Sequence, residues 1–203
     1  MQLVLHKVKA RSRIRIEGDR RMSPEKFHDF CAANPDLRAE LTAEGEIVIM
    51  PPTGAETGYR NSELTAQLRN WSRRDGRGRA FDSNVEYLLP DGSAMSPDAS
   101  WVERSRLARL TREQKRKFPP LVPDFVVELT SSTDRLPRVR KKMEAWIANG
   151  VRLAWLIDAD RRTAYTYRPH REPEKLIAPP KLKGEGPVAG FVLDLAEIWD
   201  PDI

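Results

Sequence analysis

The sequence predicts an α/β fold in which a mixed β-sheet is flanked by α-helices, preceded by an N-terminal helix and hairpin. Strand-like runs alternate with helical segments along most of the chain. The run "RLAWLID" (residues 152–158) is apolar on both faces, which is typical of a central strand covered on each side. The segment "LPRVRKKMEAWIANG" (residues 136–150) carries an apolar stripe at helical spacing. Together these observations favour the α/β class.

The first predicted elements are a helix, a hairpin and a second helix. The segment "SPEKFHDFCAANPD" (residues 23–36) predicts a helix, because Ser23 can act as the N-cap and Pro24 suits the first turn. The segment "AELTAEGEIVIMPPTG" (residues 39–54) predicts a hairpin that turns at Glu44-Gly45. The next segment, residues 57–74, predicts a helix, because its apolar residues recur at helical spacing.

Strands dominate the middle of the chain. The strand-like runs are "GRAFDSNVEYLLP" (residues 78–90), "AMSPDASWVE" (residues 94–103) and "DFVVELTS" (residues 124–131). A longer excursion separates the last two runs. It contains a Thr-x-x-Gln capping box at Thr111 and Gln114, which predicts a short helix over residues 111–118.

The C-terminal part predicts a hairpin, a loop and a final packed segment. The run "TAYTYRP" (residues 163–169) is the expected hairpin partner of residues 152–158, and the proline- and glycine-rich residues 170–190 predict a loop. After this loop, "FVLDLAEIW" is expected to pack back on the domain. We therefore expect a basic N-terminal segment over residues 1–22 and a single domain over residues 23–203.

Composition limits the classes of function. The chain has 203 residues and no apolar run near the 18 or so that a membrane span requires. Its charged start does not resemble a secretory signal, so we expect a cytoplasmic protein without membrane partners. One cysteine, Cys31, excludes an internal disulfide framework. The net charge of +5 is compatible with nucleic-acid binding, although basic clusters are also common on solvated surfaces.

Two acidic residues can form one site. In an extended "DFVVELTS", Asp124 and Glu128 share a face but are separated by about 13 Å, too far to hold one metal ion. Asp98, in the preceding strand-like run, can face Glu128 across neighbouring strands. Two facing carboxylates repel unless a cation lies between them, and oxygen ligands suit Mg²⁺ or Mn²⁺. The alternative is that Glu128 is solvated at a strand end or pairs with an arginine.

Around these acids, the sequence resembles a known family. Asp98, the run "VVELTSS" with Glu128, and the segment "RKKMEAWIANGVRLAWLIDADRRTAYTYRP" are similar to the Uma-type (DUF820-like) family of the PD-(D/E)XK nuclease superfamily. The resemblance extends from "MSPEKFHDF" to "FVLDLAEIW". It implies a restriction-endonuclease-like core in which Asp98 and Glu128 bind a divalent cation. It also implies cleavage of phosphodiester bonds.

One position departs from the superfamily pattern. That pattern places a lysine two residues after the second acid, where this chain has Thr130, whose hydroxyl carries no charge. The resemblance implies that the lysine has moved to the following helix, and Lys142 is the matching position. Thr130 remains a candidate auxiliary residue. Glu40 is another, because it matches an acid near the start of the family, where it either adds to the metal site or orients a turn.

Helical geometry bears on the choice of lysine. Lys142 lies beside the apolar stripe that includes Met143 and Trp146, whereas Lys141 points nearly the opposite way. A lysine beside a buried face needs a partner for its charge, which a carboxylate pair at the sheet edge can provide. The alternatives are that Lys142 extends along the helix to water, or that Arg140 at the other edge of the stripe takes the role.

The leading functional hypothesis is a metal-dependent endonuclease that hydrolyses DNA. Asp98, Glu128 and Lys142 are its expected catalytic residues, and Mg²⁺ or Mn²⁺ is its expected cofactor. A homodimer is also expected, since two sites suit cleavage of two strands. The alternative is a catalytically inactive nucleic-acid-binding or scaffold module with the same fold. A glycosidase using Asp98 and Glu128 as acid and base is a third hypothesis, but no sugar cleft can be read from the sequence.

Overall fold

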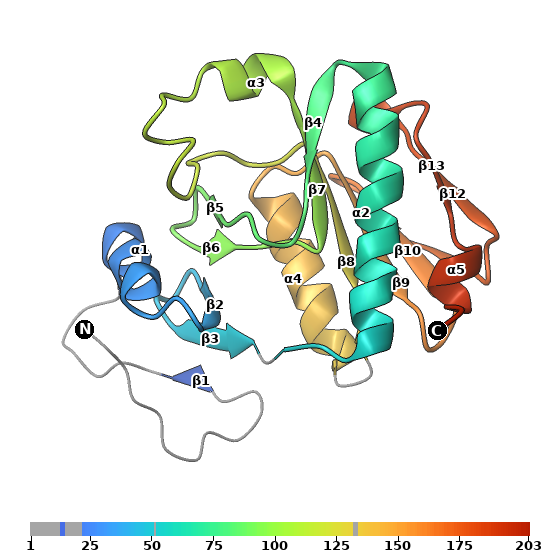
Figure 1. Cartoon of the computed structure of the whole chain (residues 1–203), viewed down its shortest axis with the longest axis horizontal. Coiled ribbons are helices and arrows are strands. Elements are labelled where there is room, and N and C mark those ends of the chain that lie inside the picture. Colours follow the sequence, from blue (N-terminus) through green and yellow to red (C-terminus); the bar gives the residue numbers. More distant parts are fainter. Residues whose placement is uncertain (1–12, 15–21, 51, 132–133) are drawn as a thin grey trace. The chain divides into compact units, whose positions relative to one another are not determined.

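The computed structural model describes residues 13–14, 22–50, 52–131 and 134–203 (Figure 1). The chain divides into two compact units. One comprises residues 1–52, 86–96 and 110–122, and the other comprises residues 53–85, 97–109 and 123–203. The predicted basic segment over residues 1–22 lies outside the described residues except for residues 13, 14 and 22. The single domain expected from residue 23 onward stays a prediction.

The larger unit is built on a six-stranded sheet with strand order β11-β10-β9-β8-β7-β4. Strands β8 and β9 pair in parallel and the other neighbours pair antiparallel, so the predicted mixed sheet is confirmed. The elements of this unit are α2 (Ala55–Asp75), β4 (Gly78–Phe81), β7 (Ala99–Glu103), α3 (Arg104–Ala108), β8 (Phe125–Leu129), α4 (Leu136–Ala148), β9 (Leu153–Asp158), β10 (Thr163–Tyr167), β11 (Glu174–Ile177), β12 (Lys181–Lys183), the 3-10 helix η1 (Gly186–Val188), β13 (Val192–Asp194) and α5 (Ala196–Trp199).

Strand β8 lies inside the sheet and is buried on both faces. Phe125, Val127 and Leu129 point to one face, where they join a core cluster with Leu64 and Leu68 of α2. Successive side chains of a strand alternate between faces, so Val126 and Glu128 point to the opposite face. Helix α4 connects β8 to its parallel neighbour β9 and contacts both strands. This connection places a helix over the face to which Glu128 points.

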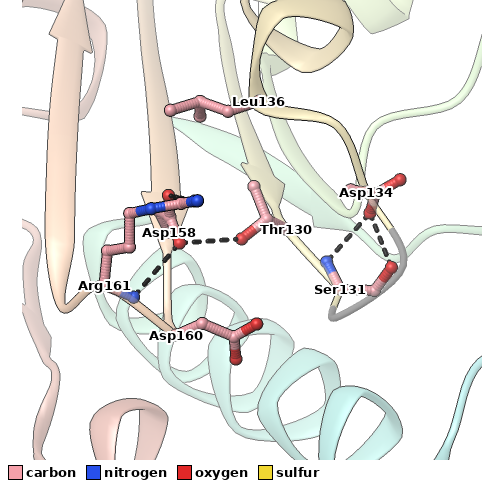
Figure 2. Close-up of a pocket in the computed structure, with 7 residues that line it drawn as sticks. All are labelled: Thr130, Ser131, Asp134, Leu136, Asp158, Asp160 and Arg161. Carbon is pink, nitrogen blue, oxygen red and sulfur yellow. Dashed lines mark hydrogen bonds and ion pairs between the residues drawn. The ribbon is translucent and has the colours of Figure 1, made fainter.

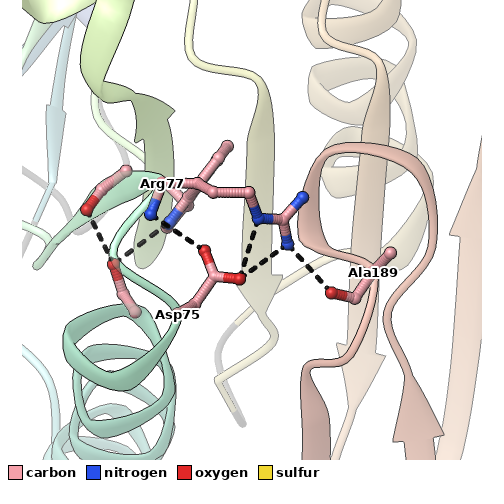
Figure 3. A network of polar contacts seen from close by, with 6 residues as sticks. Asp75, Arg77 and Ala189 are labelled. Carbon is pink, nitrogen blue, oxygen red and sulfur yellow. Dashed lines mark hydrogen bonds and ion pairs between the residues drawn. The ribbon is translucent and has the colours of Figure 1, made fainter.

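The end of α2 is tied to a distant loop (Figure 3). The helix stops at Gly76, whose φ of 77° is left-handed, a conformation that glycine adopts readily. The guanidinium of Arg77 lies 2.8 Å from a carboxylate oxygen of Asp75 and donates to the carbonyl of Ala189 at 3.0 Å. These contacts fix the end of α2 against the segment that follows η1.

The smaller unit contains the predicted N-terminal helix and hairpin. Its elements are β1 (Arg13–Ile14), α1 (Pro24–Ala33), β2 (Arg38–Leu41), β3 (Ile47–Met50), β5 (Tyr87–Leu88) and β6 (Ala94–Met95). Ser23 caps α1 by accepting a hydrogen bond from the Lys26 amide, as predicted. Strands β2 and β3 pair antiparallel around Gly45, whose φ is 80°. The sheet order is β1-β3-β2-β6-β5.

Four local predictions differ from the structure. Residues 111–118 form turns instead of a helix, although the capping box is present, with the Thr111 amide donating to Gln114 and the Gln114 amide to Thr111. The predicted loop over residues 170–190 contains β11 and β12, because these segments pair with β10 and β13. The run over residues 78–90 is divided into β4 and β5, which belong to different sheets. The run over residues 94–103 is likewise divided into β6 and β7, which belong to different sheets. The break includes Pro97, which has no amide hydrogen to donate to a ladder.

No helix among the described residues is long and apolar enough to cross a membrane.

The Asp124 carboxylate does not share a site with Glu128, because it is bound by other groups. It is only 1% exposed and accepts hydrogen bonds from the Glu103 amide and the Arg106 guanidinium, each at 2.8 Å. The guanidinium of Arg152 also lies 3.5 Å from it. A buried carboxylate with such partners secures the loop before β8 to the end of β7.

We expect Asp124→Ala to lower the free energy of unfolding by about 2 kcal/mol, measured by urea denaturation. The substitution leaves the Glu103 amide and the Arg106 guanidinium without their shared acceptor. The cost stays below that of a fully buried pair because the Arg106 side chain is 31% exposed. Asp160→Ala, at an exposed position of the same unit, serves as the control and should change stability by less than about 0.5 kcal/mol. Equal stabilities for the two variants would contradict this account of Asp124.

Candidate active site

Asp98 directly precedes β7 and lies beside the end of β8, the strand that carries Glu128. Strands β7 and β8 are antiparallel, with Ala99 opposite Val127. One step further along this register, Asp98 stands opposite Glu128. The Asp98 carboxylate accepts a hydrogen bond from the amide of Leu129, the residue after Glu128. Asp98 and Glu128 are therefore held at the place where β7 begins and β8 ends.

Asp98 precedes β7 and is held from two sides. Its Oδ2 accepts a hydrogen bond from the Leu129 amide at 2.7 Å, so the carboxylate extends the ladder beyond the first residue of β7. Its Oδ1 accepts a hydrogen bond from the side-chain amide of Asn61 on α2 at 3.1 Å. Hydrogen bonds to an ionised carboxylate are short and strong. Asp98 is therefore oriented by one strand and one helix.

Glu128 is buried against α4. Its Oε1 accepts a hydrogen bond from the Trp146 indole at 2.8 Å, and the Lys142 ammonium lies 2.9 Å from Oε1 and 3.1 Å from Oε2. The Glu128 side chain is 7% exposed and that of Lys142 is 19% exposed. A carboxylate can be buried this deeply only when charge and hydrogen bonds compensate for its lost hydration. The solvated Glu128 considered from the sequence is therefore excluded.

Arg140 and Lys141, the other cations considered as partners of the carboxylates, lie elsewhere. The guanidinium of Arg140 packs over the ring of Tyr165, 4.7 Å from its centroid, and Lys141 is exposed. Lys142 is the cation of α4 that the structure brings to Glu128. Its position beside the apolar stripe, which was inferred from helical geometry, leads to this contact.

Thr130 is directed into a separate pocket (Figure 2). The pocket has a volume of about 200 Å³ and is lined by Thr130, Ser131, Asp134, Leu136, Asp158, Asp160 and Arg161. The Thr130 hydroxyl lies 3.5 Å from Asp158, which also accepts hydrogen bonds from the amide and the guanidinium of Arg161. The structure therefore places the Thr130 hydroxyl at Asp158, an acid that already has a cationic partner.

Glu40 belongs to β2 of the smaller unit. Its Oε1 accepts a hydrogen bond from the Ser96 amide at 3.0 Å. Both residues lie in the same unit, and the contact joins β2 to the segment after β6. The auxiliary role considered for Glu40 stays a prediction.

Asp98 and Glu128 are the candidate ligands of a hydrated divalent cation. Among the described residues, no group of three or more His, Cys, Asp or Glu side chains could hold a metal ion. Mg²⁺ is commonly bound by only one or two protein carboxylates, with waters and phosphate oxygens as its other ligands. Asp98 and Glu128 would supply the two carboxylates. The carbonyl oxygen of Asn61, which is buried and has no hydrogen-bond partner among the described residues, adds an acceptor next to Asp98.

Two residues of this site were not recognised in the sequence. Trp146 was assigned to the apolar stripe of its helix, and its indole N–H was the one signal of a polar partner, since buried tryptophans usually satisfy that donor. Asn61 lies 37 residues before Asp98, in a helical segment with no motif that points to an acid. Both residues orient a carboxylate that was recognised.

Comparison with known proteins identifies similar chains. The family model described as "Uma2: Putative restriction endonuclease" matches residues 24–196. The crystal structure of "a putative nuclease belonging to DUF820 from Anabaena variabilis ATCC 29413" is 22% identical, with a TM-score of 0.72, and the match covers 88% of this chain and 97% of that one. The cryo-EM structure of the DrdV–DNA complex is 14% identical, with a TM-score of 0.37, over 57% of this chain and 9% of that one. No curated protein matches the chain significantly. The likeness to the crystal structure confirms the predicted fold class.

We expect Lys142→Met to lower the free energy of unfolding by about 2–3 kcal/mol, because it leaves the buried Glu128 carboxylate without its ammonium partner. Methionine retains most of the length of the side chain, so loss of packing is small. Chemical denaturation at neutral pH measures the effect. Lys141→Met, at the exposed neighbouring position, is the matched control and should stay within about 0.5 kcal/mol of the wild type. Similar losses in the two variants would show that the ion pair does not stabilise the fold.

Proposed function

The chain belongs to the Uma2 family, and from this membership we propose that it is a metal-dependent endonuclease that hydrolyses DNA phosphodiester bonds. The observation that carries the proposal is the placement of Asp98 and Glu128 at the adjoining ends of β7 and β8, with the Lys142 ammonium 2.9 Å from Glu128. This set of groups suits phosphodiester hydrolysis, in which negative charge builds up on a phosphate and a water molecule must be activated.

Asp98 and Glu128 are the proposed ligands of Mg²⁺ or Mn²⁺. When bound, the cation lowers the pKa of a water ligand and neutralises charge on the scissile phosphate. The Leu129 amide and the Trp146 indole keep the two carboxylates in fixed orientations. Such supporting hydrogen bonds commonly contribute tenfold to hundredfold to metal affinity or activity.

Lys142 is the proposed source of fixed positive charge. Lys142 is part of α4, and its ammonium contacts the proposed metal ligand Glu128. A preorganised ammonium can orient the attacking water or stabilise the charge that develops on phosphate oxygens. It would thereby replace the lysine that the superfamily places at the position of Thr130.

DNA is the proposed substrate because the surface around Lys142 is basic. Arg135 and Arg138 are exposed on or next to the first turn of α4, the helix that carries Lys142. The chain also carries a net charge of +5. Cations grouped beside a candidate phosphate-cleaving site suit a polyanionic substrate.

We expect the purified protein to cleave plasmid DNA with Mg²⁺ or Mn²⁺, and Asp98→Asn or Glu128→Gln to reduce the rate by a factor on the order of 100 or more. Each substitution preserves shape but removes a charged metal ligand. Glu144→Gln, an exposed position on α4, is the control and should cleave like the wild type. Wild-type rates in both active-site variants would contradict the assignment. Salt-sensitive DNA binding without cleavage under any divalent metal would favour the inactive binding module instead.

A separate prediction concerns the two adjacent lysines. Lys142→Met should lower the cleavage rate at saturating metal by a factor on the order of 100 or more, the scale expected for losing one preorganised charge contact. Lys141→Met should change the rate little, because its side chain is exposed. Rates are compared below the melting transition of each variant, so that lost stability does not appear as lost activity. Equal rates for Lys142→Met and the wild type would show that Lys142 has no role in cleavage.

A further inference from the structure

Asn61 presents an unusual pair of polar atoms beside Asp98. Its side-chain nitrogen donates to Asp98 Oδ1 at 3.1 Å. Its side-chain oxygen is buried and has no hydrogen-bond partner among the residues that the structure describes. A buried acceptor without a donor loses its hydration without compensation, so such atoms are rare in folded proteins and call for an explanation.

The orientation of the amide follows from its neighbour. An ionised carboxylate only accepts hydrogen bonds, so the nitrogen of Asn61 must face Asp98. The oxygen is then directed to the other side of the amide plane. Turning the amide over would place two oxygens against each other. The unpartnered acceptor is therefore a consequence of holding Asp98.

The helix that carries Asn61 cannot rotate to relieve this arrangement. The preceding residue, Arg60, is 7% exposed and donates to the Ile198 carbonyl at 2.9 Å. One turn further, Leu64 is completely buried in the core cluster of the larger unit. Helix α2 is thus fixed on both sides of Asn61, and the buried oxygen stays next to Asp98.

Since no described residue donates to this oxygen, a bound species is a candidate donor. A phosphodiester group has no hydrogen to donate at neutral pH, and the Lys142 ammonium is directed at Glu128. Water bound to a divalent cation is a strong donor, and such a cation keeps several waters when only one or two carboxylates bind it. The acceptor lies beside one of the two proposed metal ligands.

We propose that Asn61 is a positioning residue of the metal site, which holds Asp98 through its amide nitrogen and accepts a hydrogen bond from a cation-bound water through its carbonyl oxygen. The inference rests on the proposed function, since it requires a cation at Asp98 and Glu128. It assigns to α2 a part in the site that was otherwise built from β7, β8 and α4. The same amide would thus orient a ligand of the cation and one of its waters.

The test measures binding of Mn²⁺ alone, by calorimetry and by the electron paramagnetic resonance of free Mn²⁺, without DNA. Asn61→Leu keeps the shape of the side chain but removes both polar atoms, and its dissociation constant for Mn²⁺ should rise about tenfold or more. Without the cation, its melting temperature should stay within about 2 °C of the wild type, because the lost hydrogen bond is offset by removal of the unpartnered acceptor. Asn70→Leu, an exposed position on the same helix, is the matched control and should bind Mn²⁺ like the wild type.

A second variant separates the oxygen from the nitrogen. Asn61→Asp keeps an acceptor oxygen but loses the donor to Asp98, so it should bind Mn²⁺ more tightly than Asn61→Leu, which loses both. Wild-type Mn²⁺ affinity in Asn61→Leu, or an affinity of Asn61→Asp no higher than that of Asn61→Leu, would overturn the inference. Absence of Mn²⁺ binding by the wild-type protein would instead overturn the proposed metal-dependent function, so the two failures can be told apart.

Discussion

The burial of one charge, the Glu128 carboxylate, is the constraint on which the rest of the candidate site depends. Strand β8 is covered on both faces, and Glu128 points to the face that α4 covers. An ionised group in that position is tolerated only with compensating charge and hydrogen bonds. Lys142 and Trp146, four residues apart on α4, supply both. The spacing of one helical turn brings two different donors to the same carboxylate.

The two faces of β8 pack against two different helices. Phe125, Val127 and Leu129 pack with residues of α2, which fixes that helix and with it Asn61. The opposite face meets α4 and its lysine. Asp98, just before the neighbouring strand β7, is contacted from both β8 and α2. The apolar core and the polar site are therefore positioned by the same strand.

Asp124 and Glu128 show how neighbouring elements decide the role of an acid. Both are buried and both project from the same face of one extended segment. Asp124 is neutralised by arginines and bonded to a backbone amide at the end of β7, so it supports the fold. Glu128 is bound by a lysine and an indole from α4. The difference lies in what surrounds each carboxylate and not in the residue type.

The sequence alone determined the features that depend on local periodicity. Alternation along a strand showed that Glu128 needs a partner from another strand, and helical spacing distinguished Lys142 from Lys141. Ser23 predicted the start of α1, because an N-cap depends only on residues within one helical turn. Only the tertiary structure decided that Asn61 and Trp146 hold the two carboxylates, and that residues 174–177 and 181–183 form strands. Such contacts join residues far apart in the chain, so they cannot be predicted from a local sequence pattern. They form because packing buries polar groups, and a buried polar group needs a hydrogen-bond partner.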